Sequence, residues 1–378
     1  MKLLSNIDDQ QCLKFHVPFI MSYKNNHSTL LKPNDPVEVI RDALSKALQL
    51  REGPHKKLLV DLTGEGILFI EANAEVTLDE LGDAILPPCP FLEEFMFNVP
   101  GSDAILVGEI ARGKDAPSTS PVWERELLSA RDPPRISCTH KEFDDSIDHS
   151  YLKYGATVQQ SYCFGPNKEI KALRELLPPH LSTCSSTFEL ITACVWKCRT
   201  LSLDMDPEQI VRLSCIITAL GKHNNVCLPL GYYGNTFTYP AVVSTAERLC
   251  NSPLGYAVEL VKKSKAKMSE EYFRSTIDFV EVRGRPPLAM EGMSDFIVSD
   301  NTRTGLGEID FGLGKPVYAG VAESIDLISF YVRSTNKEER YEILVPICLP
   351  LLSMEMFQQE LKKMIGSDKV ETPSHIKL

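Results

Sequence analysis

The second half of the chain alternates strand-like apolar runs with amphipathic helical patterns, and this alternation limits the fold more than any other feature. Residues 157–164 read as a strand, whereas residues 186–200 place apolar side chains on one helical face. Ser185 or Ser186 precedes Glu189 in a capping-box arrangement at the start of that helix. Mixed helices and strands predict an α/β architecture.

Further elements of both kinds are predicted toward the C-terminus. We expect a long helix over residues 246–267, strands over residues 295–298, 325–332 and 341–349, and a final helix over residues 353–364. The chain contains no internal repeat and no low-complexity tract. These features indicate a globular fold.

Composition excludes several classes of protein. With 378 residues, 43% of them hydrophobic, the chain is long enough for a large core, and its length favours two domains. A formal net charge of -11 argues against a mainly electrostatic partner such as nucleic acid. No apolar run reaches the length of a membrane span, and the 11 scattered cysteines indicate reduced thiols, so we expect a cytoplasmic protein without a membrane partner.

A polar connection divides the chain. Residues 131–150 are rich in Pro, Ser and Asp, which is typical of an exposed segment between domains. We therefore predict an N-terminal domain over residues 1–130, a crossover over residues 131–155, and a C-terminal domain over residues 156–378.

Four segments resemble a known family, the BAHD acyltransferases. Residues 310–316 are similar to the family's DFGWGKP signature, with leucine in place of tryptophan. Residues 231–235 (GYYGN) resemble its GYFGN segment, residues 186–200 the helix that opens its second domain, and residues 346–350 a late core strand. The signature consists here of Asp310, Phe311, Gly312, Leu313, Gly314, Lys315 and Pro316, and it is regarded in the family as structural.

The resemblance implies a fold and a reaction. It implies two sandwich-like domains of the chloramphenicol acetyltransferase type, which face each other across a solvent channel. Acyl-CoA is the expected co-substrate, and a small alcohol is the expected acceptor. The protein is expected to act as a monomer and to need no cofactor or metal. Residues 58–66 and 255–263 are most similar to alcohol acyltransferases that use benzoyl-CoA or anthraniloyl-CoA.

The histidine motif that such enzymes use as a base is missing. The family has an HxxxD motif whose histidine deprotonates the alcohol, but the block that carries it is absent between Leu106 and Val107. A second segment is absent after Leu48, so the N-terminal domain is predicted to be incomplete. Altered splicing, a faulty gene model and a decaying gene copy are all compatible with these absences.

One literal HxxxD match exists, from His140 to Asp144, within the predicted crossover. It is flanked by Lys141, Glu142 and Asp145, so we expect it to be solvated. Because a base must lie within reach of the hydroxyl in a water-poor site, we interpret His140 and Asp144 as a chance match and predict no catalytic residue in this chain.

Two basic features are candidates for substrate binding, each with a structural alternative. Arg303 corresponds to an arginine that faces the acceptor pocket in relatives recognising acidic alcohols, or it forms a structural ion pair. Lys262 and Lys263, together with Lys265 and Lys267, either meet the CoA phosphates or form a solvated helix end.

Other chemistry finds little support in the sequence. Cys194 and Cys198 share a helical face, but no suitably spaced histidine accompanies them, so no metal site is predicted. Leu220 and Gly221 stand where the family often has an arginine and a serine near the CoA tunnel.

The sequence therefore predicts an acyl-CoA-dependent O-acyltransferase that transfers an aromatic or short acyl group to a small alcohol and has lost its base. The alternative is a catalytically inactive remnant, or a splice or gene-model variant, that acts at most as a binding protein.

Overall fold

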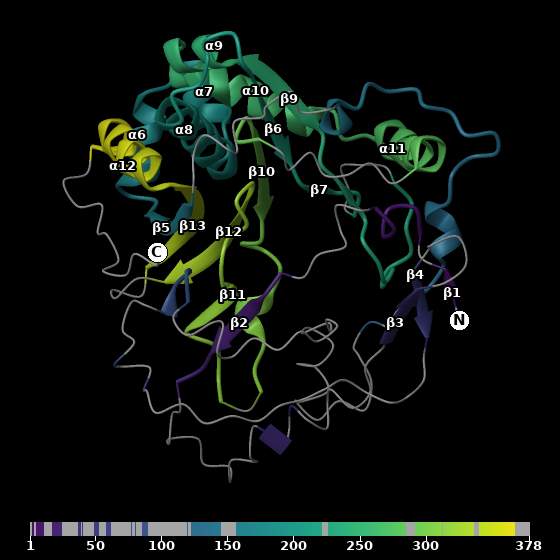
Figure 1. Cartoon of the computed structure of the whole chain (residues 1–378). Coiled ribbons are helices and arrows are strands. Elements are labelled where there is room, and N and C mark those ends of the chain that lie inside the picture. Colours follow the sequence, from purple (N-terminus) through teal and green to yellow (C-terminus); the bar gives the residue numbers. More distant parts are fainter. Residues whose placement is uncertain are drawn as a thin grey trace.

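The computed structural model describes the C-terminal two thirds of the chain almost continuously (Figure 1). The long described ranges are 122–144, 156–220, 226–284, 292–311, 313–335 and 340–366. Shorter described stretches precede them, at residues 2–3, 5–10, 17–24, 37–38, 40, 49–52, 58–61, 77, 80, 85–89 and 119. The junctions after Leu48 and Leu106 adjoin or lie in residues outside these ranges.

A six-stranded mixed sheet is the centre of the described fold. Its strand order is β5-β13-β12-β10-β6-β9. The strands are β5 (Thr157–Phe164), β6 (Ile210–Cys215), β9 (Ala241–Thr245), β10 (Asp295–Asp300), β12 (Ile328–Thr335) and β13 (Tyr341–Pro350). β10 is parallel to both β6 and β12, and the other neighbours are antiparallel. The predicted strand at 157–164 is confirmed, as is the mixed α/β class.

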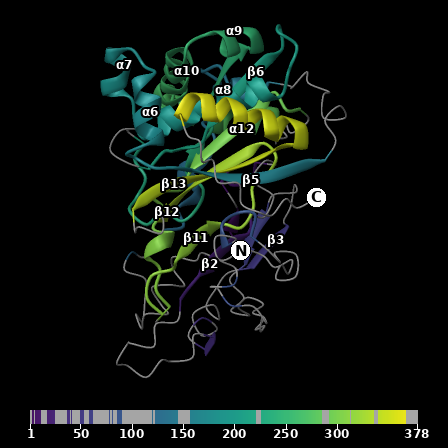
Figure 2. The same ribbon diagram turned by 90° about the vertical axis from the view of Figure 1, so that its left-hand side faces the viewer.

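One layer of helices covers one face of this sheet (Figure 2). The layer contains α6 (Glu169–Glu175), α7 (Pro179–Cys184), α8 (Thr187–Ser202), α9 (Ala246–Asn251), α10 (Leu254–Ala266) and α12 (Leu351–Ile365). α8 lies in the middle, in contact with α10 and α12, and 13 of its 16 residues are buried. The sequence predicted a single apolar face, but a helix enclosed on all sides buries its polar face as well.

The buried polar groups of α8 all find partners. The Lys197 ammonium donates to the carbonyl oxygens of Leu249 and Ser252, 2.8 Å away in each case, at the end of α9. Arg199 donates to the Met293 carbonyl oxygen at 2.5 Å. Burial lowers the pKa of Lys197. Because a buried cation is tolerated only when it is hydrogen-bonded, these carbonyls make the central helix compatible with the core.

Two helix predictions can be compared with the structure in detail. The capping box at the start of α8 is confirmed, because the Glu189 amide donates to Ser186 Oγ at 3.3 Å and the Ser186 amide to Glu189 Oε2 at 2.9 Å. The single helix predicted over residues 246–267 is wrong. The chain breaks after α9, and Pro253, which lacks an amide hydrogen, occupies the N-cap of α10.

Smaller sheets lie beside the main one. β2 (Phe19–Ser22) pairs with β11 (Tyr318–Val321), so an early segment lies against the C-terminal third of the chain. β4 (Leu58–Asp61) lies between β1 (Lys2–Leu3) and β3 (Gln49–Glu52), and β7 (Ile217–Thr218) pairs with β8 (Phe237–Thr238). Within the described residues, the other helices are α11 (Glu270–Arg283) and three 3-10 turns: η4 (Arg125–Leu128), η5 (Lys141–Phe143) and η6 (Leu306–Glu308).

Candidate functional site

The HxxxD match lies beside η5, in the segment that runs from residue 122 to 144 along α11. The prediction that His140 is solvated is wrong, because its side chain is 0% exposed. Its ring packs against Tyr272 and Phe279, with centroids 4.8 and 5.4 Å away. Hydrophobic neighbours in α11 therefore shield the histidine, whereas the polar residues beside it in the sequence suggested an exposed loop.

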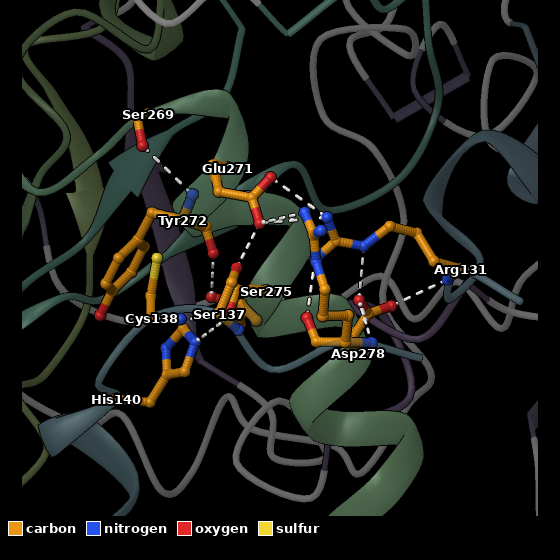
Figure 3. A network of polar contacts seen from close by, with 11 residues as sticks. Arg131, Ser137, Cys138, His140, Ser269, Glu271, Tyr272, Ser275 and Asp278 are labelled. Atoms are coloured by element: carbon orange, nitrogen blue, oxygen red, sulfur yellow. Dashed lines mark hydrogen bonds and ion pairs between the residues drawn. The ribbon is translucent and has the colours of Figure 1, made fainter. Parts of the chain in front are cut away.

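The hydrogen bonds of His140 resemble a serine, histidine and acid arrangement. Its Nε2 lies 2.8 Å from Ser275 Oγ (Figure 3), and its Nδ1 lies 2.9 Å from Glu142 Oε1. Ser275 Oγ already accepts hydrogen bonds from the amides of Ser137 and Cys138, both at 3.0 Å. The serine therefore donates its only hydrogen to Nε2, which assigns the neutral imidazole with its proton on Nδ1.

The hydrogen bonds of Ser275, His140 and Glu142 have a structural role, because these side chains cannot reach a substrate. Ser275 is 0% exposed and both of its acceptor positions are occupied, so its oxygen cannot attack a thioester. Tyr272 donates to Glu142 Oε1 at 2.5 Å and closes the site from a further direction. Ser275, His140 and Glu142 are hydrogen-bonded in the order of a catalytic triad. They are buried in a polar seam, which is the contact between α11 and residues 122–144.

Charged groups extend the same seam. Asp278, whose side chain is 0% exposed, accepts from Arg131 N at 2.8 Å, Arg131 Nε at 2.6 Å and Arg135 N at 2.9 Å (Figure 3). Glu271 accepts from Arg131 Nη1 at 3.1 Å and from the Ser137 hydroxyl. Burial alone would raise the pKa of Asp278, but the amides of Arg135 and Arg131 and the Arg131 guanidinium hold it below its usual range.

The signature motif forms a turn that contacts β2. Gly314 has φ of +91°, and its amide donates to Asp310 Oδ1 at 2.9 Å. The Phe311 ring packs edge-on against Tyr23, with 5.7 Å between centroids, and the Tyr23 hydroxyl donates to the Ile309 carbonyl. Burial, reinforced by the charge of Asp310, raises the pKa of Tyr23 to about 12. Gly312 lies outside the described residues.

The other members of the motif are at least partly accessible. Leu313 is partly buried, and the Lys315 ammonium pairs with Glu308 at 2.5 Å. This pairing lowers the pKa of Glu308. The described members of the motif thus connect η6 to β11 and rest on an early segment of the chain.

The lysines of α10 are not a uniform basic patch. Lys262 and Lys265 both pair with Glu189, at 3.2 and 2.5 Å, so they compensate the acidic member of the α8 capping box. Lys267 donates to the Ala241 carbonyl at 2.5 Å. Only Lys263 of the four is exposed at its position on α10. The sequence left open whether these lysines meet CoA phosphates or form a solvated helix end. In the structure Lys262 and Lys265 are ion-paired with Glu189, whereas Lys263 is exposed.

Arg303 lines a pocket of about 430 Å³ together with Arg333. Within the described ranges, no carboxylate forms an ion pair with Arg303. The walls of the pocket come from the first turn of α8 and from β10, β12 and β13. Arg303 and the α10 lysines are not brought together there, since neither Lys262 nor Lys263 contributes to the lining.

The described part of the chain contains no group of three or more His, Cys, Asp or Glu side chains that could hold a metal ion. Cys194 and Cys198 are buried in the core, and the hydrogen bond to Cys194, together with burial, raises the pKa of Cys198. His223 and Gly221 lie outside the described residues. None of the described helices is both long and apolar enough to span a bilayer.

The sequence did not predict the polar contact between residues 5–10 and the GYYGN segment. The Asp8 carboxylate pairs with Arg125 and accepts from the Asn235 amide at 2.8 Å. At Gly234, where φ is +156°, an added Cβ would lie 3.0 Å from Arg125 Nη1 and 3.1 Å from Asp8 Oδ2. Glycine is needed because of this close approach. The glycines of the GYYGN segment and the adjacent Asp8 and Asp9 are the sequence features that could have indicated this contact.

Comparisons with known proteins identify relatives over the whole chain. The sequence model of the Transferase family matches residues 2–105 and 106–364. Alcohol acyl transferase 1 allele GSa of Malus domestica is 52% identical, covering 100% of this chain and 92% of its own length. Benzyl alcohol O-benzoyltransferase of Petunia hybrida is 44% identical, covering 97% of this chain and 90% of its own.

Solved structures of low sequence identity have the same fold. TRI101 of F. sporotrichioides, complexed with coenzyme A and T-2, has a TM-score of 0.70 at 14% identity, covering 96% of this chain and 98% of its own. Vinorine synthase has a TM-score of 0.69 at 16% identity, covering 97% and 94%. These matches confirm the predicted fold class.

The Malus alignment is longer than this chain, and the family match is divided into two parts. This chain contributes 378 residues to a Malus alignment of 428 positions, so 50 positions have no residue of this chain opposite them. The two parts of the family match meet between Ile105 and Leu106, one residue from the junction at which a block is predicted to be missing.

Proposed function

Because the chain belongs to the BAHD family of acyltransferases, we propose that it is an acyl-CoA-dependent alcohol O-acyltransferase that lacks its catalytic base as it stands. The observation that carries this proposal is the 52% identity to an alcohol acyl transferase across the complete chain. Acyl-CoA serves as co-substrate, no further cofactor is required, and we place the acting monomer in the cytoplasm.

The proposed substrates are an aromatic or short acyl-CoA and a small alcohol. The Petunia relative, whose name records benzoyl transfer to benzyl alcohol, supports an aromatic donor. In the reaction, the hydroxyl oxygen forms a bond to the thioester carbonyl carbon and the carbon–sulfur bond breaks. The hydroxyl proton passes to a base, and CoA leaves as a thiolate that takes up a proton. An alcohol attacks slowly at neutral pH unless such a base is in place.

The chain offers no accessible base of the expected type. His140 is the only one of the eight histidines with an aspartate four residues later, and its Nε2 is occupied by Ser275. The unmatched alignment positions and the division of the family match support the loss of a base-bearing block between Leu106 and Val107. General-base catalysis contributes roughly 10²–10⁴ in rate, so turnover by this chain is expected to fall by about that factor.

The test compares the chain with a restored version. The aligned Malus segment is inserted between Leu106 and Val107, and ester formation from benzoyl-CoA with benzyl alcohol or methanol is measured by gas chromatography. We expect ester from the restored version, and ester formed about 10²–10⁴-fold more slowly by the 378-residue chain.

Two other results would contradict the proposal in different ways. Ester from neither version, although both unfold cooperatively on heating, would reject the acyltransferase assignment. Equal ester from both versions would reject the missing base. Loss of that ester on His140→Gln substitution would then identify His140 as the base.

A further inference from the structure

The contact between α8 and α12 contains three sulfur atoms that the proposed reaction does not use. Cys194 and Cys198 are four residues apart in α8, a spacing that places two side chains on the same helical face. Cys194 Sγ lies 3.7 Å from Met364 Sδ of α12, and Cys198 is hydrogen-bonded to Cys194. The Cys194 thiol therefore lies in contact with two other sulfur atoms.

The spacing of these sulfur atoms is suitable for a three-coordinate metal ion. With metal–sulfur bonds of about 2.3 Å, three sulfur ligands arranged in a plane around one ion are about 4 Å from one another. The separation of 3.7 Å between Cys194 Sγ and Met364 Sδ is close to this value. The hydrogen bond between Cys194 and Cys198 brings the third sulfur to the same place. Small side-chain movements are therefore enough to surround one ion.

The donor atoms indicate the class of metal. Thiolate and thioether sulfurs are soft ligands, and together they select Cu(I). Structural zinc sites use four ligands drawn from cysteine, histidine and carboxylate side chains, and the described residues hold no group of three of these. The two cysteines alone did not indicate a site, because Met364 is 170 residues later in the chain than Cys194.

The surrounding charges suit a bound monovalent cation. One Cu(I) held by two thiolates and a neutral thioether carries a net charge of about −1. The Lys197 ammonium is buried and favours the thiolate form of Cys198. Glu360 acts in the opposite direction, but its side chain is 25% exposed and pairs with Lys363 at 2.6 Å. Lys197 therefore compensates the charge of the metal-bound state.

An ion can reach the sulfur atoms from the end of α12. Cys194 and Cys198 are each 0% exposed, whereas Met364 is only partly buried and belongs to the last turn of α12. The ends of helices open more readily than their interiors. Opening of this turn would uncover Cys194, and its closing would enclose the ion in the core.

We propose that Cys194, Cys198 and Met364 bind one Cu(I) ion between α8 and α12. On binding, each cysteine gives its proton to solvent, bonds form from copper to the two thiolates and to Met364 Sδ, and copper stays in the Cu(I) state. Because the ion connects two helices, it stabilises their packing. The site is independent of the proposed acyl transfer, since it needs neither the missing block nor a catalytic base.

Anaerobic titration with Cu(I), in competition with a colorimetric Cu(I) chelator, tests the proposal. We expect one Cu(I) per chain, thiolate-to-copper charge-transfer absorption in the ultraviolet, and a rise in melting temperature of about 5 °C or more. The full chain is used after replacement of the exposed described cysteines, and of one cysteine outside the described residues, by serine: Cys163→Ser, Cys184→Ser, Cys227→Ser and Cys12→Ser.

Variants of the three ligands separate this site from the other thiols. Cys194→Ala and Cys198→Ala should each weaken Cu(I) binding by about a hundredfold or more, and Met364→Leu, which conserves volume, by about tenfold. Cys215→Ala removes another buried thiol, in β6, and should leave the affinity unchanged.

Thermal unfolding without metal checks that each variant is folded. Cu(I) affinity unchanged in the Cys194→Ala, Cys198→Ala double variant would overturn the proposal. Unchanged affinity in Met364→Leu, which is expected to fold normally, would also overturn it, as would Zn(II) binding as tight as that of Cu(I).

Discussion

Two buried regions of this molecule are held together by different forces. Between α8 and the sheet, apolar side chains such as Trp196 and Phe164 fill the interior. Between α11 and the segment from residue 122 to 144, buried hydrogen bonds and ion pairs centred on Asp278 and His140 form much of the contact. The first region depends on burial of apolar area, whereas the second depends on hydrogen bonds and ion pairs between buried polar atoms.

The largest effect is expected in the apolar region. Phe357 of α12 is 0% exposed and packs against Tyr162, with 5.2 Å between ring centroids. Phe357→Ala removes this contact and leaves a cavity, which should lower the free energy of unfolding by about 4 kcal/mol. Urea denaturation followed by circular dichroism measures the change. A loss below about 1 kcal/mol would mean that the core collapses around the gap.

A somewhat smaller loss is expected in the polar seam. Asp278→Asn replaces one acceptor oxygen by a donor facing the Arg131 and Arg135 donors, and should destabilise by about 3 kcal/mol. Hydrogen exchange should rise first in residues 131–144. Equal exchange increases in α8 would show that the two regions open together and would remove the distinction between them.

The same carboxylate makes the seam sensitive to acid. Because the folded pKa of Asp278 is below its ordinary value of 3.8, its contribution is fully present above that value and is lost as the pH falls through the lower folded pKa. Stability measured between about pH 4 and pH 2 should therefore fall less steeply for Asp278→Asn than for the parent chain. Parallel pH profiles would contradict this.

His140→Gln sharpens the comparison further. It breaks the pairing with Ser275 and Glu142 and should lower the free energy of unfolding by about 2 kcal/mol. In the version with the restored Malus segment, however, ester formation at a temperature below unfolding should be unchanged. A loss of turnover without a loss of stability would refute a structural role.

The smallest effect concerns backbone strain outside both regions. Gly314 has a positive φ, and no atom lies within 4 Å of a Cβ built at this position, so Gly314→Ala introduces conformational strain alone. We expect a loss of about 1 kcal/mol, measured by thermal unfolding. Gly307→Ala is a control, because its surroundings are equally open and its φ is not in the left-handed region.

The contrast between the regions also explains what could be predicted from sequence. The capping box at Ser186 and the strand at Thr157–Phe164 follow from local patterns, so they were found. α11 was missed although Ser269 caps it and two glutamates follow, which are ordinary start signals. Its polar buried face has partners more than 130 residues earlier in the chain, and no periodicity reveals such pairs.

The candidate site shows the same limit. The family motif around Asp310 was recognisable from its letters, whereas the surroundings of His140 depended on aromatic rings that only the fold brings near. Arg303 was singled out by sequence, but its neighbour Arg333 was not, because the two meet only through the order of the strands.

The burial of Ser5–Gln10 has a consequence for synthesis in the cell. Asn6 bonds to Glu281 and Asp8 to Asn235, partners that are 275 and 227 residues later in the chain. At ordinary translation speeds of 5–20 residues per second, residues 5–10 are made on the order of ten to fifty seconds before these partners. They can therefore reach their final place only after much of the C-terminal half of the chain has been made.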